Sequence, residues 1–448
     1  MPELRRVDVA WSAGIAATTL ALGAAVARQR IEFGSSAGHW VFRYLGPLEA
    51  RVVAIAFGAG IAVAVAHALA RRAVRNWPWL VVPAVFVAGV GGQLALHALS
   101  PYLLQEILVS DVTNGFYGAA ARSHPLEVLT DFERVATGLP MHARVNMPGK
   151  VLLFHALRAL TPDPLLQSVA IVALSSLAGV FLYAVVAWAF GDRRIGLDAM
   201  VLWLLVPSKI PFHPLPNVVS PLPAVIAVWC TARYLDGRGL AWAAAAGAAA
   251  YVTALFDPLA LWIGVAFAPL LANAVARRGV PVRRVVLLVA VAFGALVACH
   301  AAMVRATGFD VAARLVAMAD IVRDFNDRWS RSRDVWIVAN LTDAVLAVGP
   351  AIAVAWVAAG LTALRSIGRG TCMPGPLLAL SSLAVLAALD GICLNRGEIP
   401  RLWIFAFLPA QVAVAWWAAD RPVTRGTTIA CTLAWAAITV ATVGYCVP

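Results

Sequence analysis

Residues 110–150 hold a high density of carboxylate, imidazole and basic side chains beside the third apolar segment of a chain that is otherwise mostly hydrophobic. The residues of this stretch that could form a site are Asp111, Tyr117, Asp131, Glu133, His142, Arg144 and Lys150. Desolvation at a membrane–water boundary raises the pKa of a carboxylate, which suits a general base. Arginine binds phosphate through a bidentate fork and lysine as a point charge. The stretch therefore indicates proton and phosphate chemistry, and the alternative is a solvated loop whose charges pair with one another.

A second group of candidates lies in the proline-rich stretch 206–223. Prolines near a membrane indicate broken or re-entrant backbone, which is tolerated only where protein covers it or where it lines a cavity. We expect His213 and Asn217 to face such a cavity. The alternative is a rigid turn with no ligand.

Two later stretches add carboxylates and an arginine. Asn340 and Asp343 continue from a charged segment into apolar sequence, and an aspartate inside a span is costly enough to indicate a functional partner. Asp343 could instead pair with an arginine. Glu398 and Arg401 lie three residues apart at the start of another apolar run, where a plain salt bridge on one helical turn is the simpler reading.

The elements that must position these residues are membrane helices. The 448 residues are 62% hydrophobic and 13% charged, whereas soluble domains carry about 25% charged residues. Apolar runs near the length of a bilayer, with no alternation of period two, predict an all-α polytopic membrane protein rather than a barrel. The net charge of +12 comes almost entirely from arginines between the runs, which is typical of cytoplasmic loops and does not indicate nucleic-acid binding.

The apolar runs predict about thirteen transmembrane helices. They lie near 9–27, 51–70, 79–103, 165–190, 196–208, 217–232, 239–256, 258–276, 285–304, 337–362, 375–393, 402–418 and 427–446. A cytoplasmic N-terminus places the short arginine-bearing segments 71–75, 191–194, 233–238, 277–284, 365–369 and 420–425 inside. The outer loops are then 104–164 and 305–336, with the shorter segments 208–217 and 394–401. Because 151–160 covers only about 15 Å as a helix, we expect it to lie at the outer interface rather than to make a fourteenth span.

Taken together, these segments resemble the membrane-embedded glycosyltransferases of the GT-C superfamily, and the actinobacterial members especially. The motifs that carry the resemblance are Asp111 in "SDVTNGFY", the loop end "HARVNMPGKVLLFHAL", the outer turn "VPSKIPF", a "W…NL.D…G" element (Trp336, Asn340, Leu341, Asp343, Gly349) and a "GE..RLW.F..P" element (Gly397, Glu398, Arg401, Leu402, Trp403, Phe405, Pro409). Two features depart from the family. One is the single Pro148 where members often have two prolines, and the other is the pair of spans before the catalytic-type loop. The subfamily and the donor sugar therefore stay open.

The resemblance implies inverting transfer of a sugar, a pentose or hexose such as arabinose or mannose, from a polyprenyl-phosphate donor to an extracytoplasmic glycan, lipid or protein hydroxyl. It implies that Asp111 is the general base and that Arg401, with Lys150 or Arg144, holds the phosphate. Some relatives use a divalent cation such as Mg²⁺ or Mn²⁺, and whether Asp111 with Asp131 or Glu133 binds one here stays open.

The implied organisation is two additional N-terminal spans (1–78), a GT-C-like catalytic core (79–418) and a C-terminal span (419–448). The location is the plasma membrane, with the site on the outer side. The rival interpretation is a multi-span transporter or a lipid or polyprenyl-glycan flippase.

Overall fold

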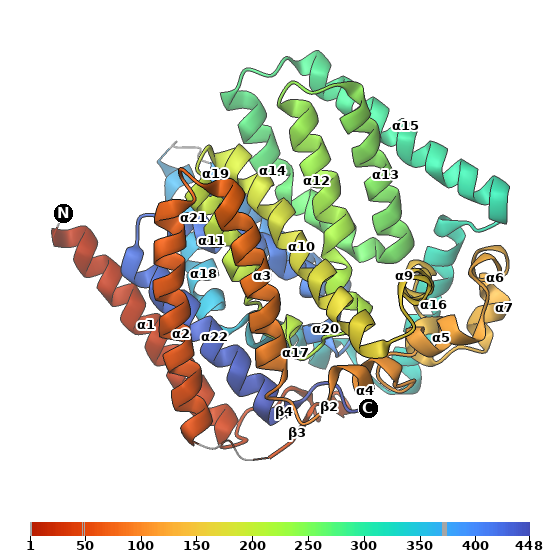
Figure 1. Cartoon of the computed structure of the whole chain (residues 1–448), viewed down its shortest axis with the longest axis horizontal. Coiled ribbons are helices and arrows are strands. Elements are labelled where there is room, and N and C mark those ends of the chain that lie inside the picture. Colours follow the sequence, from red (N-terminus) through yellow and green to blue (C-terminus); the bar gives the residue numbers. More distant parts are fainter. Residues whose placement is uncertain (1, 47, 49, 370–373) are drawn as a thin grey trace.

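The computed structural model describes residues 2–46, 48, 50–369 and 374–448, and 78% of the chain is helical (Figure 1). Among the described residues, ten helices are long and apolar enough to cross a membrane, two of them together with the preceding 3-10 turns η2 (Pro216–Val219) and η3 (Pro258–Leu261). The ten are α1 (Pro2–Ala27), α2 (Ala50–Ala73), α3 (Pro78–His97), α10 (Pro164–Phe190), α12 (Pro221–Leu235), α14 (Trp262–Arg277), α15 (Val282–Thr307), α18 (Pro350–Gly368), α19 (Pro374–Ile392) and α22 (Pro422–Thr442). An all-α multi-span membrane protein is thus confirmed.

Three of the thirteen predicted spans correspond to shorter helices. They are α11 (Arg193–Leu204), α13 (Leu240–Phe256) and α21 (Phe407–Trp417), which follows η4 (Ile404–Ala406). The 12 residues of α11 rise only about 18 Å, against about 30 Å of bilayer hydrocarbon. Its side chains are nearly all buried, so α11 is an internal helix rather than a full span by itself.

One predicted span, 337–362, is divided in two. Helix α17 (Arg333–Val348) ends before Gly349, and α18 begins at Pro350. Gly349 has φ of 90°, a conformation that favours glycine, and proline has no N–H to continue the helical hydrogen bonds. Prediction of a single helix here was wrong because the apolar run is continuous while the backbone is not.

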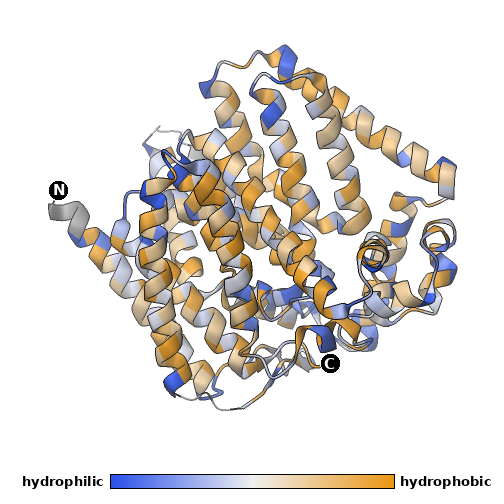
Figure 2. Ribbon diagram, in the orientation of Figure 1, coloured by the Kyte–Doolittle hydropathy of each residue, from blue (hydrophilic) through white to orange (hydrophobic). Residues whose placement is uncertain are grey.

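The short arginine-bearing turns lie together on one side of the molecule, which we call the arginine face (upper edge of Figure 1, blue in Figure 2). It comprises 71–75, 191–194, 233–238, 277–284, 365–369 and 420–425. Arg71 donates to the carbonyl of Ala419 at 3.1 Å and Arg193 to that of Arg75 at 3.0 Å. Arg71 also bonds the buried carboxylate of Asp198, which fastens α2 to α11. The grouping follows the sequence prediction, and the side of the membrane that this face occupies stays a prediction.

The other polar segments lie on the opposite side, which we call the cavity face. Its helices are α4 (Leu104–Val109), α5 (Phe116–Arg122), α6 (Pro125–Thr130), α7 (Phe132–Thr137), α8 (Met141–Arg144), α9 (Gly149–Leu160), η1 (Pro207–Lys209), α16 (Val311–Arg328), α17 and α20 (Ile399–Leu402). The cavity face also contains two antiparallel strand pairs, β1 (Gly34–Ser35) with β2 (Trp40–Val41) and β3 (Arg43–Tyr44) with β4 (Val443–Gly444).

Helix α9 contains the segment 151–160 that is too short to span. Helix α9 packs on α5 and α13; Val151, Phe154 and Leu157 on one of its faces are buried, while its C-terminal end is exposed. This amphipathic pattern agrees with the expected helix beside the spans. Because α9 begins at Gly149, its first turn brings Lys150 into the interior of the cavity face.

Candidate functional site

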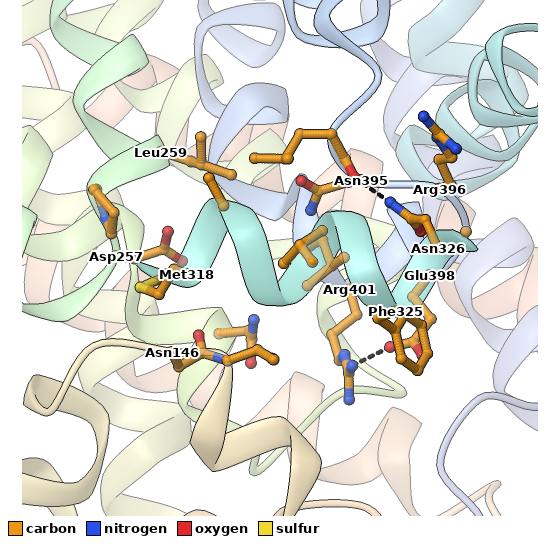
Figure 3. Close-up of a pocket in the computed structure, with 18 of the residues that line it drawn as sticks. Asn146, Asp257, Leu259, Met318, Phe325, Asn326, Asn395, Arg396, Glu398 and Arg401 are labelled. Atoms are coloured by element: carbon orange, nitrogen blue, oxygen red, sulfur yellow. Dashed lines mark hydrogen bonds and ion pairs between the residues drawn. The ribbon is translucent and has the colours of Figure 1, made fainter. Parts of the chain in front are cut away.

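A cavity of about 200 Å³ lies inside the cavity face (Figure 3). Charged and amide side chains line it together with as many apolar ones, and we call it the polar cavity after the former. Its walls come from the start of α9, from η2, from the junction of α13 and η3, from α16 and from the segment 394–402. In Figure 3, α16 crosses the cavity, with Asp257 and Asn146 toward one end and Glu398 and Arg401 toward the other. Segments separated by more than two hundred residues therefore meet around one space.

Lys150 is the most enclosed cation of the cavity, with 1% of its surface exposed. Its Nζ donates to Asn146 Oδ1 at 2.8 Å and lies 3.3 Å from Asp257 Oδ2. Burial lowers the pKa of Lys150, the Asp257 carboxylate offsets part of this decrease, and the positive charge of Arg401 lowers the pKa further. An anion bound between Lys150 and Arg401 would therefore stabilise the charged form of this lysine.

Asp257 supplies a carboxylate at the same end of the cavity. It lies at the break between α13 and η3, directly before Pro258, so the helix cannot continue through it. Its Oδ2 accepts from Ser220 Oγ at 2.7 Å and faces Lys150. Among the described residues both hydrogen bonds to this carboxylate reach Oδ2, and Asp257 lines the cavity, where it could accept from a substrate hydroxyl.

The other end of the cavity is positively charged. Arg401 forms an ion pair with Glu398, and both side chains are mostly buried, at 13% and 20% exposed. Arg331 donates to the carbonyl of Arg396 at 2.6 Å and lies over the ring of Phe325. Burial lowers the pKa of Arg331 and Glu398 raises it. Four basic and two acidic side chains line the cavity, so its potential favours an anion.

Amide side chains also line the cavity. They are Asn146, Asn217, Asn326 and Asn395. An amide both donates and accepts, which is the pairing that sugar hydroxyls require. Asn326 donates to the carbonyl of Leu394 at 3.0 Å, which joins α16 to the segment bearing Glu398. The cavity thus combines cations, carboxylates and amides in one partly enclosed volume.

A second cavity of about 250 Å³ adjoins the first. Glu398 and Arg401 line both, so their ion pair lies between the two. The other walls of the second cavity come from 40–43, from Val112 and Thr113, from Phe212 and from the chain end at 444–447. Thr113 is held by a hydrogen bond of 2.6 Å from its Oγ1 to the carbonyl of Val447.

Four of the predicted site residues line the first cavity: Lys150, Asn217, Glu398 and Arg401. Two others are fully buried and do not line it. Asn340 donates to the carbonyl of Asn395 at 2.9 Å and so holds the backbone of a segment that lines the cavity. Asp343 Oδ1 accepts from the N–H of Gly34 at 2.8 Å and so joins α17 to β1.

Arg144 contributes through its backbone. Its carbonyl accepts from Arg314, a buried residue of α16 that also holds both carboxylate oxygens of Glu133 at 2.9 Å. The Arg314 guanidinium bonds the carbonyl of Asn146 at 3.3 Å as well. The Arg144 side chain itself is exposed.

The remaining predicted residues lie elsewhere. The Asp111 carboxylate is 48% exposed and pairs with Arg122 at 2.8 Å, and it is not among the residues that line either cavity. Asp131 pairs with Arg134, and both side chains are exposed.

Tyr117 and His213 contact other side chains and line neither cavity. Tyr117 packs edge-on against Phe154, with ring centroids 6.0 Å apart. His213 is buried and faces Gln93 Oε1 at 3.0 Å instead of the cavity. The side chain of His142 lies outside the described residues.

A bound divalent cation gains no support from the described side chains, since no three histidine, cysteine, aspartate or glutamate residues among them gather as metal ligands. Asp111, Asp131 and Glu133, the carboxylates considered for a metal, each face a different arginine. Metal dependence stays open.

The sequence reading missed six polar residues that line the first cavity: Asn146, Asp257, Asn326, Arg331, Asn395 and Arg396. Asp257 carried a usable signal, because an aspartate directly before a proline separates two apolar runs. Asn146 and Arg331 carried none, since nothing local distinguishes them from other loop residues.

Comparison of the chain with protein-family models, with curated proteins and with solved structures found no match. The class that fold and composition establish is a multi-span helical membrane protein.

Proposed function

We propose that the protein is a membrane glycosyltransferase that moves a sugar from a polyprenyl-phosphate donor to a hydroxyl acceptor. One observation carries the proposal: Lys150, Arg331 and Arg401 converge with Asp257 and four asparagines in a single polar cavity at one end of an apolar helical bundle. Such a cavity suits a ligand whose phosphate and sugar are polar and whose tail stays in hydrocarbon. The resemblance of the sequence to GT-C enzymes supports the same reaction.

In this reaction a carboxylate takes the proton of the acceptor hydroxyl. The hydroxyl oxygen attacks the anomeric carbon, and the bond from that carbon to the phosphate oxygen breaks, so the lipid phosphate leaves with the bonding electrons. Lys150 and Arg401 stabilise the charge that grows on the departing phosphate. The asparagines orient the sugar, since positioning of both reactants lowers the barrier of a reaction that forms no covalent enzyme intermediate.

The carboxylate that takes the proton is Asp257 in this proposal. Asp111, the base implied by the resemblance, faces Arg122 and solvent, whereas Asp257 lines the cavity beside the phosphate-binding lysine. The clustering of polar residues at one end of the bundle also favours an enzyme over a transporter, which needs its site near the middle of the membrane.

The first test removes the cation at the centre of the cavity. Purified protein is incubated with radiolabelled polyprenyl-phosphate sugars and candidate glycan acceptors, and transfer is measured against donor concentration. We expect Lys150→Met to raise the KM for donor by about tenfold or more, because a charge-assisted hydrogen bond contributes roughly 1.5–3 kcal/mol.

The control is Arg158→Met, which removes one positive charge from the exposed side of the same helix. We expect its donor KM to equal that of the wild type. Equal effects of the two variants, or no transfer from any polyprenyl-phosphate sugar to any acceptor by the wild type, would contradict the proposal.

A further inference from the structure

An apolar groove of about 780 Å³ runs between α2 and α3, with α11 and α22 forming the rest of its walls. In Figure 1 these helices lie on the side of the bundle away from α15, and in Figure 2 their surfaces are mainly apolar. Of the residues that line the groove, His67 is the single titratable one, near the arginine face. The proposed reaction at the polar cavity does not use this groove.

The groove exists because α2 and α3 are held by different partners. Gly60 of α2 lies against the backbone of α22, where an added Cβ would come within 2.6 Å of the Ala430 carbonyl oxygen. Gly89 of α3 lies against α11, where a Cβ would come within 2.6 Å of the Leu204 side chain. Helix α2 therefore packs closely on α22 and α3 on α11, whereas α2 and α3 make little contact with each other.

The length of the groove indicates the kind of molecule that fills it. Its lining extends from Val52 to Ala70 on α2, about 27 Å, and from Leu80 to Leu96 on α3, about 24 Å. The hydrocarbon core of a bilayer is about 30 Å thick, so an acyl chain of a phospholipid reaches only about half of it. A groove that continues through both leaflets fits one hydrocarbon chain longer than a leaflet.

The groove also leads toward the polar cavity. On α22 it ends near Ala437, and the chain then reaches Gly444 and Tyr445, which line the second cavity about 10 Å further along. The second cavity shares Glu398 and Arg401 with the first. A chain in the groove could therefore carry a phosphate that approaches Arg401 from the membrane.

We infer that the groove between α2 and α3 binds the polyprenyl chain of the lipid phosphate whose head group enters the polar cavity. The inference rests on the proposed function for the identity of the head group. The chain itself is identified by the length of the groove and its apolar walls. Of the two N-terminal spans, α2 then has a role in substrate binding.

Gly92 and Gly91 provide a matched pair of variants for the test. Gly92 lines the groove and Gly91, its neighbour on α3, does not, and an added Cβ meets no atom within 4 Å at either position. Phenylalanine can therefore be placed at both without a clash at Cβ, but only Gly92→Phe obstructs the groove. Binding of decaprenyl phosphate and of geranyl phosphate is measured with the purified protein in phosphatidylcholine nanodiscs.

We expect the wild type and Gly91→Phe to bind decaprenyl phosphate at least about tenfold more tightly than geranyl phosphate. Gly92→Phe should lose that preference and keep the wild-type Kd for geranyl phosphate, which shows that the head-group site is intact. Equal behaviour of the two phenylalanine variants would overturn the inference. So would a diacyl phospholipid, seen by native mass spectrometry, that only Gly92→Phe releases and that decaprenyl phosphate does not displace.

The binding readout separates this inference from the proposed reaction. If chain-length preference depends on Gly92 but no sugar is transferred from any donor, the glycosyltransferase proposal fails and the groove remains a polyprenyl site. If sugar transfer occurs with the same efficiency in both phenylalanine variants and on long and short donors, the reaction stands and the groove assignment fails.

Discussion

At the scale of single residues, the surroundings of a carboxylate decide what it can do. Asp111 and Asp257 are both aspartates near the ends of apolar segments. Asp111 forms an ion pair with Arg122, and both side chains are about half exposed. Such exposed ion pairs contribute little to stability. Asp257 is mostly enclosed, accepts from Ser220 and lies 3.3 Å from Lys150 Nζ at the same end of the cavity. Enclosure makes each of these interactions stronger and places the carboxylate beside any bound substrate.

This difference gives a prediction for the two matched variants Asp257→Asn and Asp111→Asn. Each removes a negative charge with almost no change in volume. Loss of a general base lowers the rate by about a hundredfold to ten-thousandfold, so we expect that decrease in kcat for Asp257→Asn and near wild-type kcat for Asp111→Asn. Steady-state transfer assays measure both, and the opposite ranking would return the catalytic role to Asp111.

At the scale of elements, close approach of backbones rather than hydrophobicity determines how the helices pair. The first and last spans show this, because α1 and α2 both pack on α22 although almost the whole sequence separates them. The N–H groups at Val423 and Thr424, at the start of α22, donate to the Asp8 carboxylate of α1. Gly60 allows α2 to contact α22 along the same surface. Small residues at such contacts are what membrane helix packing favours.

The contact at Gly60 predicts a difference between two glycines of one helix. Gly60→Val should destabilise the protein by about 1–3 kcal/mol, since overpacking forces the backbones of α2 and α22 apart. Gly58→Val should change stability far less, because a Cβ at Gly58 meets no atom within 4 Å. Thermal unfolding of the two variants in the same detergent gives the comparison, and equal unfolding temperatures would show that the close contact does not form.

At the scale of the whole molecule, polarity divides the bundle into two faces. The arginine face consists of short turns that bond to one another, whereas the cavity face carries the long segments 104–164 and 305–336. Arginine-rich short loops are typical of the cytoplasmic side. We therefore predict that the polar cavity faces the outer side of the membrane, where a lipid-linked sugar rather than a nucleotide sugar is the expected donor.

Labelling of single cysteines tests this orientation. In a chain whose six native cysteines are replaced, Leu160→Cys reports on the cavity face and Val282→Cys on the arginine face, and the native side chains are 83% and 76% exposed. A membrane-impermeant maleimide on intact cells should label position 160, and position 282 only after permeabilisation. Labelling of both, or of 282 alone, would reverse or refute the orientation.

Much of the architecture could be predicted from the sequence because it depends on local composition. Runs of apolar residues predicted the ten long helices, and the arginines between them predicted which turns share a face. The same local reasoning failed at Gly349 and Pro350, where hydrophobicity continues through a backbone break. It also gave the 12-residue α11 as a full span, since an internal helix and a membrane span are equally apolar.

By itself, then, the sequence determined that this is a helical membrane protein whose reactive side chains lie in a few polar segments. The reason is that the hydrophobicity of each segment decides whether that segment lies in hydrocarbon or in water. Only the tertiary structure decided which polar residues meet. Lys150, Asp257 and Arg401 come from three distant segments, and Asp111 is held by Arg122 only eleven residues away. The physical reason is that ion pairs and hydrogen bonds form between whichever groups packing brings within about 3 Å, and distance along the chain does not predict that.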